Sequence, residues 1–405
     1  SPVMRFFVVV VSTLVIASGV SFWFFPEFSA SSPLIYTKKG IVPPTPLKND
    51  AAKTTAAVVS EAAQAVMPPP PVVTRLKTPD PLKAIYMTSW IAGTPHLRPR
   101  LLALLDETEL NAIVIDIKDS TGKIAFPVDD PYLQAIGSSE KRIADLPELL
   151  RELHAKNIYA IGRVAVFQDA YLPFVRPDLA LHKKSNGALW HDSKGLFWLD
   201  QTSPEAWKYI VHIARESYAQ GFDEINFDYV RFPSDGNVAD IAYHNQATST
   251  PVNKPQALER FFKYLHKELA DIPLVTSADL FGQITSSQDD MGIGQSIERA
   301  APYFDYISPM VYPSHYYPGF LNYKKPADHP YEVVKYAMLQ GALKLANASS
   351  SPTKLRPWLQ DFDMGATYTA AMVRAQIQAT YDAGLTSWML WDPSNQYTPA
   401  ALLPK

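Results

Sequence analysis

Residues 221–232 read GFDEINFDYVRF, and this stretch decides the fold. Its side chains alternate between apolar and polar, which is the period of a β-strand with two different faces. One face carries large apolar side chains that suit packing against helices. The other face would point into the interior of a barrel, and it carries Glu224, Asn226, Asp228 and Val230.

Apolar runs of similar length recur on both sides of this strand, with amphipathic segments between them. The other runs occupy residues 83–90, 112–119, 158–167, 274–282, 306–312, 355–362 and 387–394. Helices are predicted at 97–108, 141–156, 203–220, 255–270, 330–347 and 368–382, with a short one near 295–301. Alternating strands and helices form a parallel sheet, and eight strands close a TIM barrel. We therefore predict an α/β fold, a (β/α)8 TIM barrel over residues 81–405.

The amino-terminal residues predict a membrane anchor. The stretch from Phe6 to Phe25 carries no charge, and about 20 such residues span the hydrocarbon core of a bilayer. We assign residues 1–25 to a transmembrane signal-anchor. A cleaved secretory signal is the alternative, and 17–19 would be its small-residue cleavage site. Arg5 precedes the apolar stretch, which favours an extracytoplasmic barrel, in the periplasm or at the cell surface.

A proline-rich tract separates this stretch from the predicted barrel. Residues 26–80 contain ten prolines and one glycine, and alanine is abundant. Proline runs favour extended polyproline geometry, so we expect a semi-rigid linker without chemistry of its own.

The composition excludes several classes of function. The net charge of −3 and the pI near 6.3 offer no polycation for nucleic acid. The chain has no cysteine, and its nine histidines are scattered without an HExxH motif. We therefore expect no metal site and no cofactor. The oligomeric state is left open.

Asp228 is the main catalytic candidate, because its predicted position is near the carboxyl end of a barrel strand, where barrel enzymes carry their active sites. A structural alternative is an interior ion pair, and Arg163 on the preceding strand has the phase to form it. Asp279 ends the next predicted strand, so the two carboxyl groups should be neighbours. Glycoside hydrolysis needs two such groups. For Asp279 the alternative is a cap of the following loop.

Polar and aromatic side chains gather at the other strand ends. Aromatic faces stack on the apolar faces of sugar rings, and polar groups orient the hydroxyl groups. The predicted substrate-binding residues are Trp90, Asp116, Lys118, Arg163, Asn226, Arg231, Tyr312, Gln360, Trp391 and Asp392.

A family resemblance supports this interpretation. Residues 221–236, GFDEINFDYVRFPSDG, resemble the fourth-strand signature of a bacterial family of inferred glycoside hydrolases, formerly a domain of unknown function. The blocks KAIYMTSW, AIVIDIKDSTGKI, YISPMVYPSHY and LWDPSNQYT are similar to its other motifs. The resemblance covers roughly residues 80–400. It implies a (β/α)8 barrel distantly related to the α-amylase-like and chitinase-like barrels.

Two comparisons with those barrels help to select the catalytic candidates. Chitinase-like barrels carry their acid two residues after the position of Asp228, where this chain has Val230. Amylase-like barrels take the nucleophile from strand 4 and the acid from strand 5, a layout that Asp228 and Asp279 imitate. The amylase-like arginine is Asn226 here, so that match is partial.

The leading hypothesis is hydrolysis of an O-glycosidic bond in an envelope or extracellular polysaccharide, with Asp228 as nucleophile or base and Asp279 as acid. A second hypothesis is a non-catalytic carbohydrate-binding barrel on a membrane stalk. A third is hydrolysis of an ester or amide, against which the lack of a Gly-x-Ser-x-Gly elbow weighs. The sugar, the linkage and the stereochemical course are left open.

Overall fold

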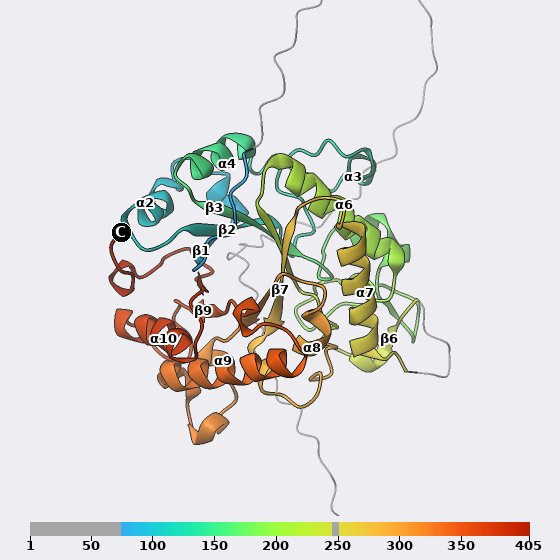
Figure 1. Ribbon diagram of the computed structural model, residues 1–405. Helices are drawn as coiled ribbons and strands as arrows, with labels where there is room; N and C mark the ends of the chain where they lie inside the picture. The colour runs from blue at the N-terminus through green and yellow to red at the C-terminus, as the bar shows by residue number, and fades with distance from the viewer. Residues whose placement is uncertain (1–73, 245–250) are drawn as a thin grey trace, which may run out of the picture.

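Parallel strands form a closed barrel in the structure, a computed structural model that describes residues 74–244 and 251–405. Each predicted strand is present (Figure 1). The barrel strands are β1 (Lys83–Met87), β2 (Ala112–Lys118), β3 (Tyr159–Ala165), β5 (Glu224–Asp228), β7 (Val275–Phe281), β8 (Tyr306–Met310), β9 (Trp358–Gln360) and β10 (Trp388–Trp391). Their order around the barrel is β1-β10-β9-β8-β7-β5-β3-β2, so the predicted (β/α)8 fold is confirmed.

Helices surround the strands, as Figure 1 shows. Those that follow the prediction are α2 (Pro99–Glu107), α4 (Leu146–Ala155), α6 (Pro204–Gln220), α7 (Lys254–Glu268), α8 (Ile297–Ala300), α9 (Pro330–Asn347) and α10 (Ala370–Asp382). The ends of α6 illustrate why these helices begin and end where they do. Ser203 accepts a hydrogen bond from a first-turn N–H group, and Gly221 has a φ of 118°, which suits the left-handed residue after a helix.

Short elements in the loops were not predicted. They include the helices α1 (Ser89–Ala92), α3 (Pro131–Ile136) and α5 (Leu172–Val175), and the strands β4 (His182–Lys183) and β6 (Ile241–Ala242). The 3-10 turns are Pro177–Leu179, Val238–Asp240, Gly282–Thr285, Pro313–His315, Phe320–Asn322, Pro326–Asp328, Pro352–Lys354 and Pro399–Ala401. β4 and β6 pair antiparallel, which joins the loop after β3 to the loop after β5 at the carboxyl end of the barrel.

The strands separate two apolar layers. Ile225 and Phe227 belong to the larger layer between strands and helices, as the alternation in β5 predicts. Tyr86, Val114 and Trp358 belong to a smaller cluster inside the barrel. The phase of β5 therefore sends Asn226 and Asp228 to the interior, where both are buried.

The amino-terminal end of the barrel is closed by the first described residues. The backbone N–H of Leu76 donates to Asp223 Oδ1 at 2.8 Å, and Thr78 Oγ1 lies 3.0 Å from Tyr159 Oη. Residues 74–80, the end of the predicted linker, therefore pack against the barrel. The predicted anchor at 1–25 and the rest of the linker lie outside the described residues. Within 74–244 and 251–405, no helix is long and apolar enough to cross a membrane.

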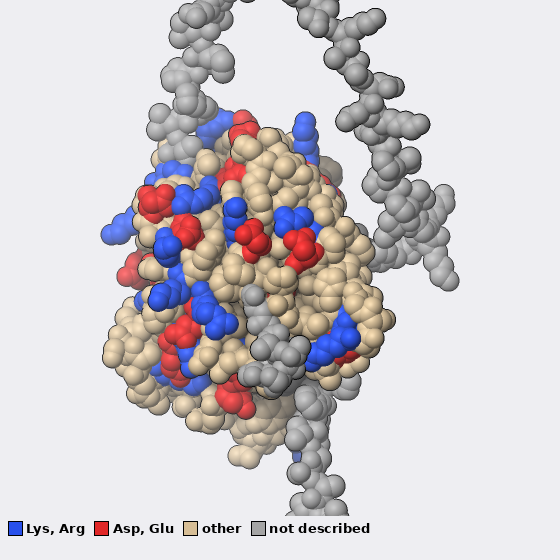
Figure 2. Space-filling model, turned by 90° about the vertical axis from the view of Figure 1, so that its right-hand side faces the viewer, with Lys and Arg blue, Asp and Glu red and all other residues tan. Residues whose placement is uncertain are grey.

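Charges of both signs are interspersed on the surface. Figure 2 shows lysine and arginine side chains beside aspartate and glutamate on the face that it draws. This mixture agrees with the small net charge of −3.

Candidate active site

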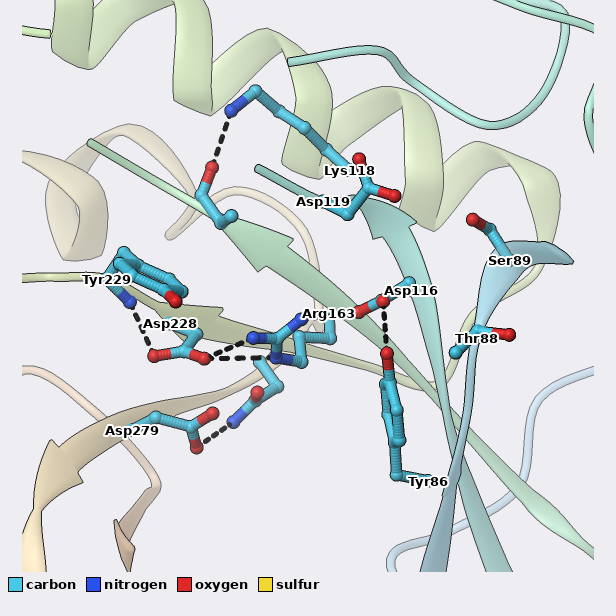
Figure 3. Close-up of polar contacts among 12 residues, drawn as sticks. Tyr86, Thr88, Ser89, Asp116, Lys118, Asp119, Arg163, Asp228, Tyr229 and Asp279 are labelled. Atoms are coloured by element: carbon cyan, nitrogen blue, oxygen red, sulfur yellow. Dashed lines mark hydrogen bonds and ion pairs between the residues drawn. The ribbon is translucent and has the colours of Figure 1, made fainter. Parts of the chain in front are cut away.

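Asp228 is the last residue of β5 and lies at the carboxyl end of the barrel (Figure 3). Its Oδ2 accepts hydrogen bonds from Arg163 Nε, at 3.1 Å, and from Arg163 Nη2. Its Oδ1 accepts the N–H of Tyr229 at 2.6 Å. Tyr229 has a φ of 53°, a conformation that is strained for a bulky side chain. The strained turn thus places the Tyr229 N–H group so that it donates to the Asp228 carboxylate. Both oxygens of Asp228 accept hydrogen bonds.

Arg163 connects Asp228 to a second carboxylate. Its Nη1 lies 2.5 Å from Asp116 Oδ1, and Tyr86 Oη donates to Asp116 Oδ2. The Trp391 ring stacks on the Tyr86 ring with centroids 3.9 Å apart, and its centroid lies 5.0 Å from the Arg163 guanidinium. Burial raises the pKa of Asp116, and the charge of Arg163 offsets part of that effect. The interior ion pair considered as the alternative role for Asp228 is therefore present.

Asp279 in β7 has a different environment. Its Oδ1 accepts hydrogen bonds from Asn226 Nδ2 and from Trp358 Nε1, each at 2.8 Å. Both of these donors are side chains inside the barrel, whereas a loop cap would bind backbone N–H groups. Burial raises the pKa of Asp279 well above its usual range, and the negative charge of Asp228 raises it further. Asp279 therefore holds its proton to a higher pH than an ordinary carboxyl group does.

The two neighbouring carboxyl groups thus differ in a way that acid–base chemistry requires. Asp228 is surrounded by a guanidinium and a backbone donor, which stabilise a charged carboxylate. Asp279 is buried beside that charge and held by neutral donors. Two neighbouring carboxyl groups in such different environments can take the roles of an acid and of a base or nucleophile.

Among the other predicted residues, Tyr312 and Trp391 lie close to these groups. Burial raises the pKa of the Tyr312 hydroxyl well above its usual range, and Asp279 and Asp228 add to the shift. Gln360 and Asp392 organise the loops instead. Gln360 Oε1 accepts the Ser314 N–H at 3.2 Å, and Asp392 Oδ1 accepts the N–H and hydroxyl of the residue two positions later.

Lys118 pairs with another carboxylate. The β2–β3 register shifts between Asp116 and Lys118, and Lys118 Nζ pairs with Asp169 at 2.9 Å. Lys118 is fully buried there, which corrects the expectation that it shares the environment of Asp116. Arg231 is also buried, and its guanidinium lies 4.9 Å from the centroid of Trp198.

Trp90 lies on α1, directly after β1, and is half exposed. It therefore sits at the rim of the barrel rather than beside the buried carboxyl groups.

The sequence reasoning missed Tyr86 and the direct contact of Trp358 with Asp279. Tyr86 lies two residues after Ala84, on the same face of β1, and both belong to the interior cluster. The alternation within residues 83–90 could have placed Tyr86 in the interior. No pattern along the chain signals the contact of Trp358, because it joins residues 79 positions apart.

A metal site does not emerge from the part of the chain that the structure describes. Across residues 74–244 and 251–405, no group of three or more histidine, aspartate or glutamate side chains could hold a metal ion.

Two carboxyl groups, Asp228 and Asp279, lie at neighbouring strand ends of this (β/α)8 barrel, an arrangement that glycoside hydrolysis can use. A family model described as "Putative glycosyl hydrolase domain" matches residues 84–397, and the chain belongs to this family. The resemblance noted in the strand motifs is thereby confirmed.

Several solved structures are similar to this chain. A hypothetical protein from Ruminiclostridium thermocellum is 32% identical over 48% of this chain and 96% of its own, with a TM-score of 0.43. The glycoside hydrolase domain of PgaB (BpsB) from Bordetella bronchiseptica is 13% identical over 80% of this chain and 99% of its own, with a TM-score of 0.54.

A third similar structure is longer than this chain. The α-L-fucosidase isoenzyme 2 from Paenibacillus thiaminolyticus is 14% identical over 79% of this chain and 47% of its own, with a TM-score of 0.51. This chain thus spans about half of that enzyme. At 13% and 14% identity the likeness shows the fold alone. No curated protein matches the chain.

Proposed function

We propose that this protein hydrolyses O-glycosidic bonds of an envelope or extracellular polysaccharide by a two-carboxylate mechanism. Asp279 donates a proton to the departing sugar oxygen. Asp228 acts on the other side of the scissile bond, as nucleophile or as the base that activates water. Membership of the glycosyl hydrolase family supports the reaction class.

The observation that carries the proposal is the contrast between the two carboxyl groups. The raised pKa of Asp279, caused first by burial and then by Asp228, supplies an acid that keeps its proton to a higher pH than an ordinary carboxyl group. The hydrogen bonds of Arg163 and Tyr229 hold Asp228 as an oriented carboxylate. This contrast supports the roles that the leading sequence hypothesis gave to Asp228 and Asp279.

Substitution of each carboxyl group by its amide tests the proposal. We expect Asp228→Asn to abolish release of reducing ends while the protein stays folded, because Arg163 keeps its contact with Asp116. The measurements are reducing-end release from polysaccharides and thermal unfolding. An Asp228→Asn protein that unfolds would identify Asp228 as a structural member of the ion pair.

Asp279→Asn should slow hydrolysis on the order of 10²–10⁴-fold when the leaving group is a sugar. A glycoside with a nitrophenolate leaving group needs no proton, so the loss should be much smaller there. In the unmodified protein, activity should fall as the pH rises through the raised pKa of Asp279. Equal losses on both leaving groups would show that the acid is another residue.

The alternative, a carbohydrate-binding barrel without catalysis, has one observation in its favour. Arg163 pairs with both Asp116 and Asp228, as a purely structural cluster would. This alternative predicts saccharide binding that persists in Asp228→Asn, with no reducing ends released by either protein.

The location that we propose is extracytoplasmic, with residues 1–25 as a membrane anchor and the proline-rich tract as a linker. Its support is the uncharged stretch from Phe6 to Phe25 and the position of Arg5 before it.

A further inference from the structure

Trp90 is the exception among the tryptophans that the structure describes. Its exposed fraction is 47%, whereas none of the others in residues 74–244 and 251–405 exceeds 8%. An exposed indole is apolar surface that folding leaves in water, and tryptophan is enriched at binding interfaces. Because α1 follows β1 at its carboxyl end, Trp90 lies at the same end of the barrel as Asp228 and Asp279.

The indole is backed on one face by a buried cation. The Arg142 guanidinium lies 4.2 Å from the Trp90 ring centroid, and the Arg142 side chain is almost fully buried. Arg142 Nη1 donates to Ser89 Oγ and to Asp119 Oδ2, each at 2.8 Å, and Nη2 pairs with Glu140 at 3.0 Å. The cation is therefore neutralised and fixed, and it holds the ring in place.

The short helix that carries Trp90 is also fixed at its start. Thr88 Oγ1 accepts the Ile91 N–H at 3.1 Å, and the Thr88 N–H donates to Asn395 Oδ1 at 2.9 Å. A ring that is ordered before binding loses little entropy when a ligand stacks on it. The outer face of Trp90 is thus a rigid aromatic surface at the rim.

The barrel separates this ring from the carboxyl groups. Four steps around the barrel lead from β1 to β7 in either direction, so Trp90 and Asp279 belong to opposite sides. Strand spacing and tilt give an eight-stranded barrel a diameter of about 15 Å. In Figure 3, Ser89 and Asp119 lie on the far side of the drawn cluster from Asp279. A single sugar ring does not bridge that distance.

We infer that Trp90 is a distal sugar subsite, and that the substrate is a chain of several neutral sugars lying across the mouth of the barrel. One ring would bind at Asp228 and Asp279 while another stacks on the free face of Trp90. The subsite deepens the proposed function and rests on it. It makes recognition depend on the length of the saccharide.

Calorimetry on the full chain tests the subsite, with Asp279→Asn present in every protein so that probes are not cleaved. The probes are hexasaccharides and disaccharides of β-1,4-linked N-acetylglucosamine, β-1,4-linked glucose and α-1,4-linked glucose. Adding Trp90→Ala should weaken hexasaccharide binding about ten-fold, the scale of one aromatic stacking contact. Disaccharide binding should change less than about two-fold. Leu339→Ala, an exposed apolar position on α9, is the matched control and should change neither.

The outcomes separate the subsite from the reaction. Equal hexasaccharide binding with and without Trp90→Ala overturns the subsite, as does a failure of all three hexasaccharides to bind. Trp90-dependent binding combined with no reducing ends from the unmodified protein leaves the subsite standing and overturns the hydrolase. Cleavage of a hexasaccharide that Trp90→Ala neither weakens in binding nor slows leaves the hydrolase standing and overturns the subsite.

Discussion

Arg163 pairs with two carboxylates at once. This arrangement determines how substitutions at the carboxyl end of the barrel should affect stability. Its guanidinium contacts Asp116 on one side and Asp228 on the other, and all three side chains are nearly buried. One positive charge therefore stabilises two negative ones in a poorly solvated environment. The same contacts that could orient Asp228 for catalysis also support the fold.

Arg163→Gln should lower the free energy of unfolding by on the order of 3–5 kcal/mol, because it leaves Asp116 and Asp228 buried without their cation. Urea unfolding measures the loss. Arg176→Gln is the control, since its pair with Asp178 is more exposed and should cost at most about 1 kcal/mol. Equal losses of unfolding free energy in the two proteins would show that the buried pairs of Arg163 contribute no more to stability than the exposed pair of Arg176.

Asp279 should make stability depend on pH. Its pKa in the folded protein is raised, first by burial and then by Asp228, so the folded state keeps a proton that the unfolded state releases. Stability is therefore complete below the usual carboxyl pKa and falls as the pH rises toward the raised value. Asp279→Asn, which cannot ionise, should match the unmodified protein near pH 4. Above pH 4 its free energy of unfolding should exceed that of the unmodified protein by about a further 1.4 kcal/mol per pH unit, until the pH reaches the raised pKa of Asp279. A difference in the free energy of unfolding between the two proteins that stays the same at all pH values would contradict the raised pKa of Asp279.

At the scale of single residues, the sequence predicted the face of a strand on which a side chain lies better than it predicted the residues that the side chain contacts. The alternation in residues 224–230 placed Asp228 and Asn226 inside the barrel, and the phase of β3 suggested the contact with Arg163. Lys118 pairs with Asp169 rather than with Asp228, and a register shift in β2 just before it is not visible in the sequence pattern. Whether a buried carboxyl group is charged depends on three-dimensional neighbours that no local pattern contains.

At the scale of elements, the strands and long helices follow directly from hydrophobic periodicity. α9 spans 330–347 as predicted, and α6 differs from its prediction by one residue at its start. The loops were less predictable. β4 and β6 are two-residue strands whose pairing joins segments 59 positions apart, which is too short a pattern to recognise in either segment.

Gly93, which ends α1, tests how tightly this element is packed. A Cβ atom there would lie 1.9 Å from the carbonyl oxygen of Arg142, so the backbone would have to shift. We expect Gly93→Ala to lower the free energy of unfolding by about 1–3 kcal/mol. Gly341→Ala in the middle of α9 is the comparison. Its Cβ would meet only side-chain ends, of Leu355 at 3.1 Å and of Thr285 at 3.4 Å, and alanine favours a helix by up to about 1 kcal/mol. A Gly93→Ala protein as stable as Gly341→Ala would show that α1 moves freely.

At the scale of the whole molecule, the two ends of the barrel carry different features. The carboxyl end carries Asp228, Asp279 and the exposed Trp90. The amino-terminal end receives the chain from the linker, where Leu76 binds Asp223. Asp223 Oδ2 also accepts the Ala160 N–H at 2.8 Å and contacts His154 Nε2 at 2.9 Å, so the attachment is part of the barrel. The carboxyl end, with Asp228 and Asp279, is thus the end of the barrel opposite residues 74–80.

The proposed orientation across the membrane can be tested because the chain has no cysteine. Lys77→Cys and Tyr317→Cys each introduce one thiol, at exposed positions near the linker and in the loop after β8. In spheroplasts, a membrane-impermeant maleimide should label both proteins without lysis, and both should stay with the membrane after an alkaline wash. Labelling that requires lysis would place the barrel in the cytoplasm. Labelling without lysis, followed by release in the wash, would instead show that the amino-terminal stretch is a cleaved signal, because only an uncleaved apolar span resists extraction.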